Sequence, residues 1–245
     1  MKVVLFCGGL GTRLREFSET IPKPLATIGS RPILWHLMRY YAHFGHTHFV
    51  LCLGYRGDLI QEFVRRDEGI DRSWTVECVE TGPEASLGDR LRAVEPSLRG
   101  EEIFLANYSD AVTDLPLPNY LDLFRARSAV AGFVSVRNPQ SFHVVRVDDA
   151  GVVTALTRAR DAELWINGGF FAFRPAIFEY IQPGDELVEE PFQRLMQTGR
   201  LYSYKHTGFW AAMDTFKDKV SLDRRHAQGD SPWEVWNRHG AAEIP

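Results

Sequence analysis

The chain has 245 residues, of which 44% are apolar, enough to build one sizeable hydrophobic core. Its 28 basic and 32 acidic residues give a formal net charge of −4, which argues against a polybasic surface for nucleic acid or for a membrane. No apolar run approaches the roughly 20 residues of a membrane span, so we expect a soluble protein of the cytoplasm.

The first 110 or so residues alternate between predicted strands and predicted helices. We expect strands over 2–6, 48–53, 74–80 and 102–107, and helices over 32–44, 58–64 and 88–98. This order is typical of βαβ units around a parallel sheet, which binds its ligands at the carboxyl ends of its strands. A glycine-rich loop after residue 6 and the pair Ser109-Asp110 each follow such an end.

The second half mixes strands and helices less regularly. We expect strands over 131–137, 141–147, 152–156 and 201–206, an apolar glycine-bearing segment over 166–174, and helices over 191–197 and 214–225. Cys7, Cys52 and Cys78 lie in strand-like runs and fit no zinc-binding spacing, so we expect reduced thiols. Since we find no linker and no repeat, a single α/β domain is the expected organisation.

Three glycines occur within four residues directly after the first predicted strand, at Gly8, Gly9 and Gly11, and Arg13 and Lys23 follow. Glycines at such a turn let a ligand approach the backbone, whose N–H groups bind phosphate oxygens. The loop is neither a dinucleotide fingerprint, because the third glycine of G-x-G-x-x-G is missing, nor a Walker loop. A turn that merely needs glycine is an alternative for the glycines alone, but the arginine and the lysine favour phosphate binding.

The segment G-G-L-G-T-R-L, followed by ten residues ending in P-K-P, resembles the signature of the sugar-1-phosphate nucleotidylyltransferases. Further segments match this family in order. They are T-G with G-D-R-L from residue 81, Y-S-D-A-V from residue 108, W-I-N-G-G-F-F from residue 165, G-F-W-A-A-M-D-T from residue 208 and P-W-E-V-W from residue 232. The resemblance covers nearly the whole chain and points most closely to the glucose-1-phosphate cytidylyltransferases.

The resemblance implies a Rossmann-like α/β domain with a mainly parallel, mixed β-sheet flanked by helices. Residues 1–114 would form a nucleotide-binding half, and residues 115–245 a sugar-binding half with a helical tail. The implied reaction transfers CMP from CTP to a sugar-1-phosphate such as glucose-1-phosphate, which releases pyrophosphate and forms a nucleotide-sugar. The family and the tail tryptophans Trp233 and Trp236 also suggest a homo-oligomer.

The resemblance also implies which residues do the work. Arg13 and Lys23 would be catalytic, neutralising the phosphates, and Asp110 and Asp214 would hold Mg²⁺ through hard oxygen ligands. The implied nucleotide-binding residues are Phe6, Cys7, Gly8, Gly9, Leu10, Gly11, Thr12, Arg13, Lys23, Thr81, Gly82, Arg90 and Ser109. The implied sugar-phosphate-binding residues are Arg158, Asn167, Gly168 and Gly169.

The sequence departs from the family pattern in three places. Ser109-Asp110-Ala111 replaces a G-D-G, T-R-A-R around Arg158 replaces a glutamate-lysine-proline triplet, and the middle of the chain is short. Two alternatives therefore stay open. One is the same reaction with dTTP, GTP or UTP, or with another phosphate or phosphonate acceptor. The other is a non-catalytic paralogue that binds nucleotide-sugars and regulates a partner.

Overall fold

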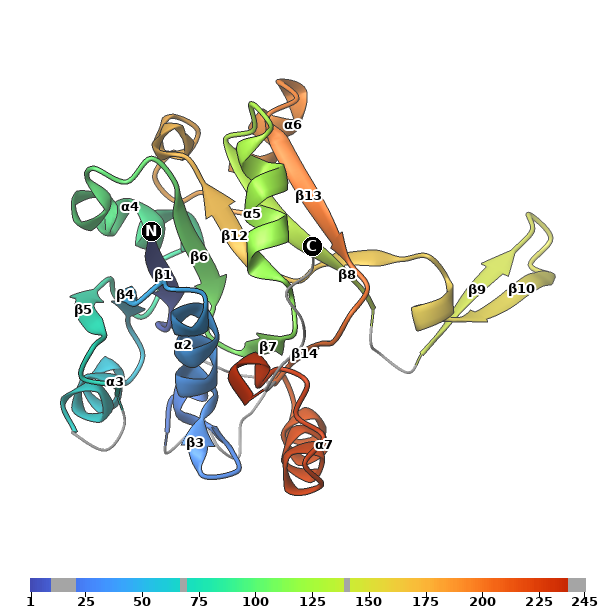
Figure 1. Ribbon diagram of the computed structural model, residues 1–245. Helices are drawn as coiled ribbons and strands as arrows, with labels where there is room; N and C mark the ends of the chain where they lie inside the picture. The colour runs from blue at the N-terminus through green and yellow to red at the C-terminus, as the bar shows by residue number, and fades with distance from the viewer. Residues whose placement is uncertain (10–20, 67–69, 139–141, 238–245) are drawn as a thin grey trace, which may run out of the picture.

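A mixed, mainly parallel sheet forms the centre of the computed structural model, which describes residues 1–9, 21–66, 70–138 and 142–237 (Figure 1). Its strand order is β11-β8-β12-β6-β1-β4-β5, with β13 beside β8. The strands are β1 (Lys2–Phe6), β4 (His48–Leu53), β5 (Thr75–Glu80), β6 (Phe104–Tyr108), β8 (Ala131–Arg137), β11 (Trp165–Asn167), β12 (Phe171–Phe173) and β13 (Leu201–His206). β1, β4, β5 and β6 run parallel, whereas β11 and β12 run antiparallel to their neighbours. The predicted fold class is confirmed.

Helices cover both faces of this sheet (Figure 1). They are α2 (Ile33–His43), α3 (Gly57–Arg65), α4 (Leu87–Ala93), α5 (Leu117–Arg125) and α6 (Glu190–Gln197). Alternate residues of β1 face opposite sides, so Val3 and Leu5 belong to one core cluster and Val4 and Phe6 to a second. The first cluster packs under α2, α3 and α5, and the second under α4 and α6. No helix in the described ranges combines the length and the apolarity needed to cross a bilayer.

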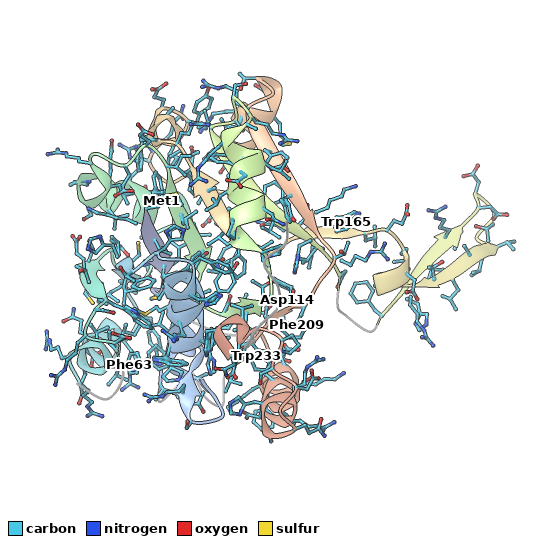
Figure 2. The ribbon with its side chains drawn as sticks, in the orientation of Figure 1. Met1, Phe63, Asp114, Trp165, Phe209 and Trp233 are labelled. Atoms are coloured by element: carbon cyan, nitrogen blue, oxygen red, sulfur yellow. The ribbon has the colours of Figure 1, made fainter. Side chains whose placement is uncertain are left out.

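A third, smaller core packs the C-terminal part of the chain against the rest of the protein. Here β7 (Ala111–Thr113) pairs antiparallel with β14 (Trp210–Ala212), and helix α7 (Phe216–Ala227) follows. Trp233 is fully buried in this core, where its ring lies beside that of Phe209 (Figure 2). Trp236 packs edge-on against Trp35, so both tail tryptophans contact the body of the same chain. A short hairpin of β2 (Thr27–Ile28) and β3 (Arg31–Pro32) lies beside α7.

A hairpin of β9 (His143–Val147) and β10 (Val153–Arg158) forms a separate two-stranded sheet that stands clear of the body (Figure 1). We call this hairpin the arm. Most of its large apolar side chains are exposed, namely Val145, Val147, Val153 and Leu156, together with Phe142 and Val152 beside the strands.

The structure differs from the predicted elements at a few points. Helix α5 is not predicted from the sequence, because Pro116 and Pro118 argue against a helix in this segment. A proline is nevertheless tolerated in a first helical turn, where its missing N–H would have no partner. The predicted segment 166–174 separates into β11 and β12, because Gly169 has a φ of +78° and breaks the extended run. The predicted helix 88–98 ends at Ala93 and continues as a 3₁₀ turn, Glu95–Leu98. The start of α7 at Phe216 is set by the N-cap Thr215, which leaves Asp214 ahead of the helix.

Candidate active site

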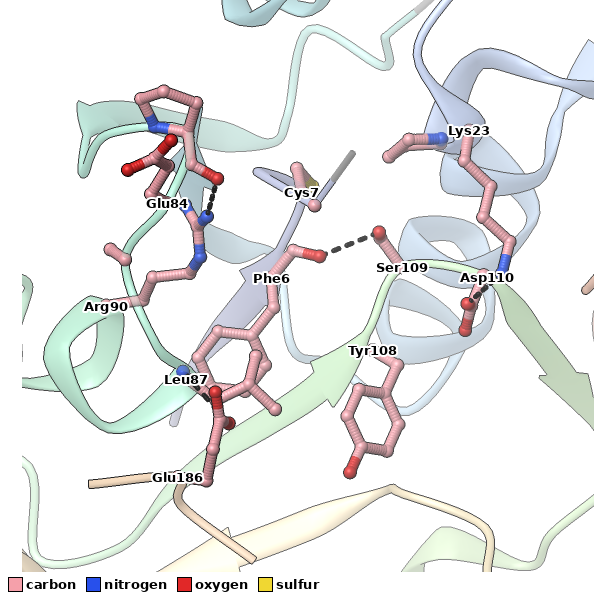
Figure 3. Close-up of a pocket in the computed structure, with 14 residues that line it drawn as sticks. Phe6, Cys7, Lys23, Glu84, Leu87, Arg90, Tyr108, Ser109, Asp110 and Glu186 are labelled. Carbon is pink, nitrogen blue, oxygen red and sulfur yellow. Dashed lines mark hydrogen bonds and ion pairs between the residues drawn. The ribbon is translucent and has the colours of Figure 1, made fainter. Parts of the chain in front are cut away.

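A cavity of about 540 Å³ opens at the carboxyl ends of β1 and β6 (Figure 3). Its walls come from the loop after β1, the loop before α4, the end of β6, the 3₁₀ turn that begins at Lys23, and one residue of the second half, Glu186. The lining residues are Phe6, Cys7, Gly9, Lys23, Pro24, Pro83, Glu84, Ala85, Leu87, Arg90, Tyr108, Ser109, Asp110 and Glu186. The cavity therefore lies where a parallel sheet is expected to bind a ligand.

Lys23 and two aspartates meet at one end of this cavity. The Lys23 ammonium donates to Asp110 Oδ2 at 2.5 Å and to Asp214 Oδ1 at 2.7 Å. The pairing of β7 with β14 brings the two aspartates together, because Asp110 precedes β7 and Asp214 follows β14. The Met213 N–H also donates to the Asp110 carbonyl at 2.8 Å, which fixes the two segments side by side.

The charges at this end depend on one another. Burial alone would lower the pKa of Lys23, but the carboxylates of Asp110 and Asp214 hold that pKa above its ordinary value. Lys23 therefore stays an ammonium ion at neutral pH.

The donor set at this end also fits Mg²⁺. Two carboxylates converge on one point that already holds a cation, and carboxylate oxygens are ligands that Mg²⁺ prefers. In the part of the chain that the structure describes, no group of three His, Cys, Asp or Glu side chains gathers at any metal-binding spacing. A magnesium ion held by one or two carboxylates takes its other ligands from water and from substrate phosphates.

Arg90 lies at the other end of the cavity and is only 3% exposed. Its Nη1 donates to the Leu53 carbonyl at 3.2 Å and to Thr81 Oγ1 at 2.6 Å. Its Nη2 donates to the Gly8 carbonyl at 3.1 Å and to the Pro83 carbonyl at 3.2 Å. One guanidinium thus ties together the ends of β1, β4 and β5.

Two glycines leave the space that Arg90 fills. A Cβ atom on Gly8 would overlap the guanidinium of Arg90, whereas a Cβ atom on Gly9 would meet no atom of the described residues within 4 Å. A Cβ atom on Gly54, just after β4, would lie 2.6 Å from the Gly82 carbonyl oxygen, 2.7 Å from that of Gly8 and 2.9 Å from Arg90 Nη1. Gly8 is therefore packed against the Arg90 side chain, and Gly54 against both this side chain and backbone.

Ser109 and Ala111 stand where the resembling family has glycines, and the side chains of both pack within the protein. The Ser109 hydroxyl donates to the Phe6 carbonyl at 2.8 Å and joins the ends of β6 and β1 (Figure 3). The Ala111 side chain is 1% exposed and belongs to the first core cluster. Both side chains flanking Asp110 thus have partners within the protein.

The remaining expected nucleotide-binding residues are placed as follows. Phe6, Cys7 and Gly9 line the cavity, whereas Thr81 and Gly82 do not. The Thr81 hydroxyl instead donates to the Leu53 carbonyl at 2.6 Å. The expected residues Leu10, Gly11, Thr12 and Arg13 lie outside the described residues.

The expected sugar-binding turn reaches the cavity through Tyr108. Asn167 Nδ2 donates to the Tyr108 hydroxyl at 3.3 Å, and Tyr108 lines the cavity. Burial raises the pKa of Tyr108 to about 12, so the phenol stays protonated. The Gly168 carbonyl accepts from Trp210 Nε1 at 2.9 Å, and a Cβ atom on Gly169 would overlap Asn107 Oδ1.

Arg158 is not among the residues that line the cavity. It is the last residue of β10, where it pairs with His143, and its side chain is exposed on the arm. The predicted role of Arg158 at the sugar phosphate remains a prediction.

Sequence reasoning missed two kinds of lining residue. Tyr108 stands within the matched segment Y-S-D-A-V, so its position was a usable signal. Glu186 and Glu84 lie outside the segments that match the family, so nothing in the sequence pointed to them. The loop of Glu186 is brought to α4 by contacts between distant segments, among them the Gly184 N–H donating to Asp89 Oδ1 at 3.1 Å.

Comparison with known sequences finds similarity over nearly the whole chain. The family model described as "Nucleotidyl transferase" matches residues 2–223. A "Probable glucose-1-phosphate cytidylyltransferase" of Bacillus subtilis is 33% identical, across 96% of this chain and all of the relative. A "Glucose-1-phosphate cytidylyltransferase" of Salmonella typhi is 34% identical over the same shares of both proteins. A "Mannose-1-phosphate guanyltransferase" of Saccharomyces cerevisiae is 28% identical, across 90% of this chain and 63% of the relative.

Comparison with solved structures finds the same fold. HddC from Yersinia pseudotuberculosis, complexed with GMP-PN, superposes with a TM-score of 0.72 at 20% identity and covers 92% of this chain and 99% of that one. A UDP-glucose pyrophosphorylase complexed with UDP-glucose gives a TM-score of 0.73 at 16% identity, over 93% and 98% of the two chains.

Proposed function

The chain belongs to the nucleotidyl transferase family, and from that premise we propose that it transfers CMP from CTP to a sugar-1-phosphate. An oxygen of the sugar phosphate attacks the α-phosphorus of CTP, pyrophosphate leaves, and a nucleotide-sugar is formed. The observation that carries this proposal is the meeting of Lys23, Asp110 and Asp214 at one end of the cavity.

The chemistry asks the protein to bring two polyanions together and to stabilise charge on the reacting phosphorus. Lys23 supplies a protonated ammonium at the phosphate end of the cavity, and Arg13 is proposed to add a second cation. Asp110 and Asp214 are the residues that would hold Mg²⁺. That ion, when bound, neutralises charge on the phosphates.

We propose that the two halves of the chain divide the substrates between them. Residues 1–114 supply nearly all of the cavity wall and would bind the nucleotide. Residues 115–245 supply the Asn167 turn, which touches the cavity through Tyr108 and would bind the sugar. Asp214 comes from the second half and contacts Lys23 of the first, so the phosphates would lie at the junction.

CTP as donor and glucose-1-phosphate as acceptor are supported by the cytidylyltransferase relatives, although relatives and structural neighbours with other nucleotides exist. We expect purified protein with Mg²⁺ and glucose-1-phosphate to release pyrophosphate with CTP and not with dTTP, GTP, UTP or ATP. A coupled pyrophosphate assay measures this directly.

Release with a different nucleotide would overturn the choice of donor and leave the reaction class standing. If no nucleotide gave pyrophosphate release with any member of a wide panel of sugar phosphates, the result would favour the non-catalytic alternative. In that case, thermal unfolding tells whether the site still operates, because a site with two aspartate ligands should let CTP raise the melting temperature only when Mg²⁺ is present.

The cytoplasm is the proposed location. Cys7, Cys52 and Cys78 are free thiols, and burial raises the pKa of each, so all three are protonated and unreactive at neutral pH. Such cysteines suit a reducing compartment, in which the nucleotide donor is also present.

A homo-oligomer is proposed because of the arm. A two-stranded hairpin is marginally stable by itself, and this one exposes Val145, Val147, Val153 and Leu156 by 51% to 64% each. Apolar residues gathered on one projecting element mark a surface for protein contact. A second copy of the chain is the partner that is always present.

Charging the arm should therefore dissociate the oligomer. Val147 and Val153 face each other across the two strands, so V147K with V153K places two like charges on the exposed patch. Light scattering after size exclusion should give a smaller mass for this variant than for the wild type. Leu123→Lys, at a lone exposed leucine on α5, is the matched control and should keep the wild-type mass. A monomeric wild type, or a double variant of unchanged mass, would refute the proposed role of the arm.

A further inference from the structure

We propose that Lys23 is the cation that Asp110 and Asp214 hold before nucleotide binds, so that a divalent metal enters the site only together with the nucleotide. This inference rests on the proposed function for the identity of the two metal ligands. It goes beyond that function because it gives Lys23 a second task, which is to keep the aspartates occupied.

The contacts that carry the proposal are short and come from three separate parts of the chain. Lys23 opens the 3₁₀ turn Lys23–Leu25, Asp110 lies between β6 and β7, and Asp214 follows β14. The Lys23 side chain is 12% exposed, and those of Asp110 and Asp214 are 25% and 33% exposed. The ammonium thus faces the two carboxylates from a largely buried position. Its contact with Asp110 is the dashed line beside Lys23 in Figure 3.

An ammonium in this place competes with a divalent ion. It donates hydrogen bonds to Oδ2 of Asp110 and to Oδ1 of Asp214, and so offsets the charge of both carboxylates. A metal held by the same two carboxylates would lie close to the ammonium, and the two cations would repel each other in a half-buried site. Binding of the metal alone would therefore require Lys23 to give up its contacts with Asp110 and Asp214.

A triphosphate removes this conflict. Its oxygens offer the ammonium new partners, and they also complete the ligand shell of a metal that has only two carboxylates from the protein. Lys23 can then turn from the aspartates toward a phosphate, within a cavity that it lines together with Asp110. Because binding linkage is reciprocal, a nucleotide that raises the affinity for metal is bound more tightly, by the same factor, when the metal is present.

The test is the affinity of the nucleotide-free protein for Mn²⁺, a spectroscopic substitute for Mg²⁺, titrated by electron paramagnetic resonance. Lys23→Met should bind Mn²⁺ about tenfold or more tightly than the wild type, although it loses catalytic activity. Lys23→Arg keeps the cation and should bind Mn²⁺ as weakly as the wild type. Lys205→Met, at an exposed lysine on β13, removes the same charge elsewhere and should also bind as the wild type does.

A second variant guards against a folding defect in Lys23→Met. Lys23→Gln is neutral but keeps a hydrogen-bond donor for the carboxylates. It should gain as much affinity for Mn²⁺ as Lys23→Met does. Adding Mn²⁺ should also raise its melting temperature by more than it raises that of the wild type. Neutral variants that bind Mn²⁺ no more tightly than the wild type would overturn the proposal. Failure of the proposed function would look different: the wild type would release no pyrophosphate, whatever its affinity for Mn²⁺.

Discussion

Asp110→Asn is expected to lower the rate of pyrophosphate release by about a thousandfold or more while leaving the fold intact. The change removes one of the two proposed metal ligands, and a loss of metal-based charge stabilisation of about 4 kcal/mol corresponds to about three orders of magnitude in rate. The fold should survive because the Asp110 side chain contacts Lys23 at the edge of the cavity, while the Asp110 carbonyl still accepts from the Met213 N–H. Turnover with CTP and glucose-1-phosphate, together with circular dichroism, measures both effects.

Asp122→Asn provides the matched control for this prediction. Asp122 is an exposed aspartate of α5 that pairs with Arg125, and its neutralisation changes the net charge equally. Turnover of the Asp122 variant should match that of the wild type. If Asp110→Asn also kept near-normal turnover, the assignment of Asp110 as a metal ligand would be wrong.

Gly8→Ala is expected to destabilise the protein by about 2 kcal/mol and to impair nucleotide binding, while the neighbouring Gly9→Ala is expected to do neither. An alanine methyl at position 8 overlaps the Arg90 guanidinium, which four hydrogen bonds hold in place. Overpacking of this kind costs about 1–3 kcal/mol, because the structure must shift or give up bonds. At position 9 the same methyl meets nothing within 4 Å in the part of the chain that the structure describes.

Urea unfolding gives the free energies for this pair, and titration with CTP gives the affinities. The comparison is informative because both variants add one methyl group to adjacent residues of the same loop. Equal loss of stability in the two would mean that backbone freedom, and not the space taken by Arg90, is what the loop requires. An unaffected Gly8→Ala would show that Arg90 can move without loss.

The central sheet could be predicted from the sequence because its parallel strands are short apolar runs with distinct ends. β1 and β4 have the predicted bounds, and β6 begins two residues after its predicted start. β7 and β14 could not be predicted, since each has three residues and is defined by pairing with the other. Three residues are too few to show the alternation of apolar and polar side chains by which a strand is predicted.

The same limit applies to the site. Lys23, Asp110 and Asp214 stand in segments that match a family signature, so their importance could be predicted. The contact of Lys23 with Asp214, however, depends on the β7–β14 pair. Arg90 was expected to touch nucleotide, and its sequence environment could not show that the guanidinium would be buried against backbone carbonyls. Arg158 was matched by position alone, and it lies on the arm.

The packing of Arg90 against Gly8 also has an evolutionary consequence. The two residues fill one volume, so a side chain at position 8 is compatible only with a shorter residue at position 90. Position 54 is different, because the carbonyl oxygens of Gly82 and Gly8 would still crowd a side chain there after a change at Arg90. In descendants of this sequence, the substitution at Arg90 should therefore come first, and position 8 should become variable only afterwards.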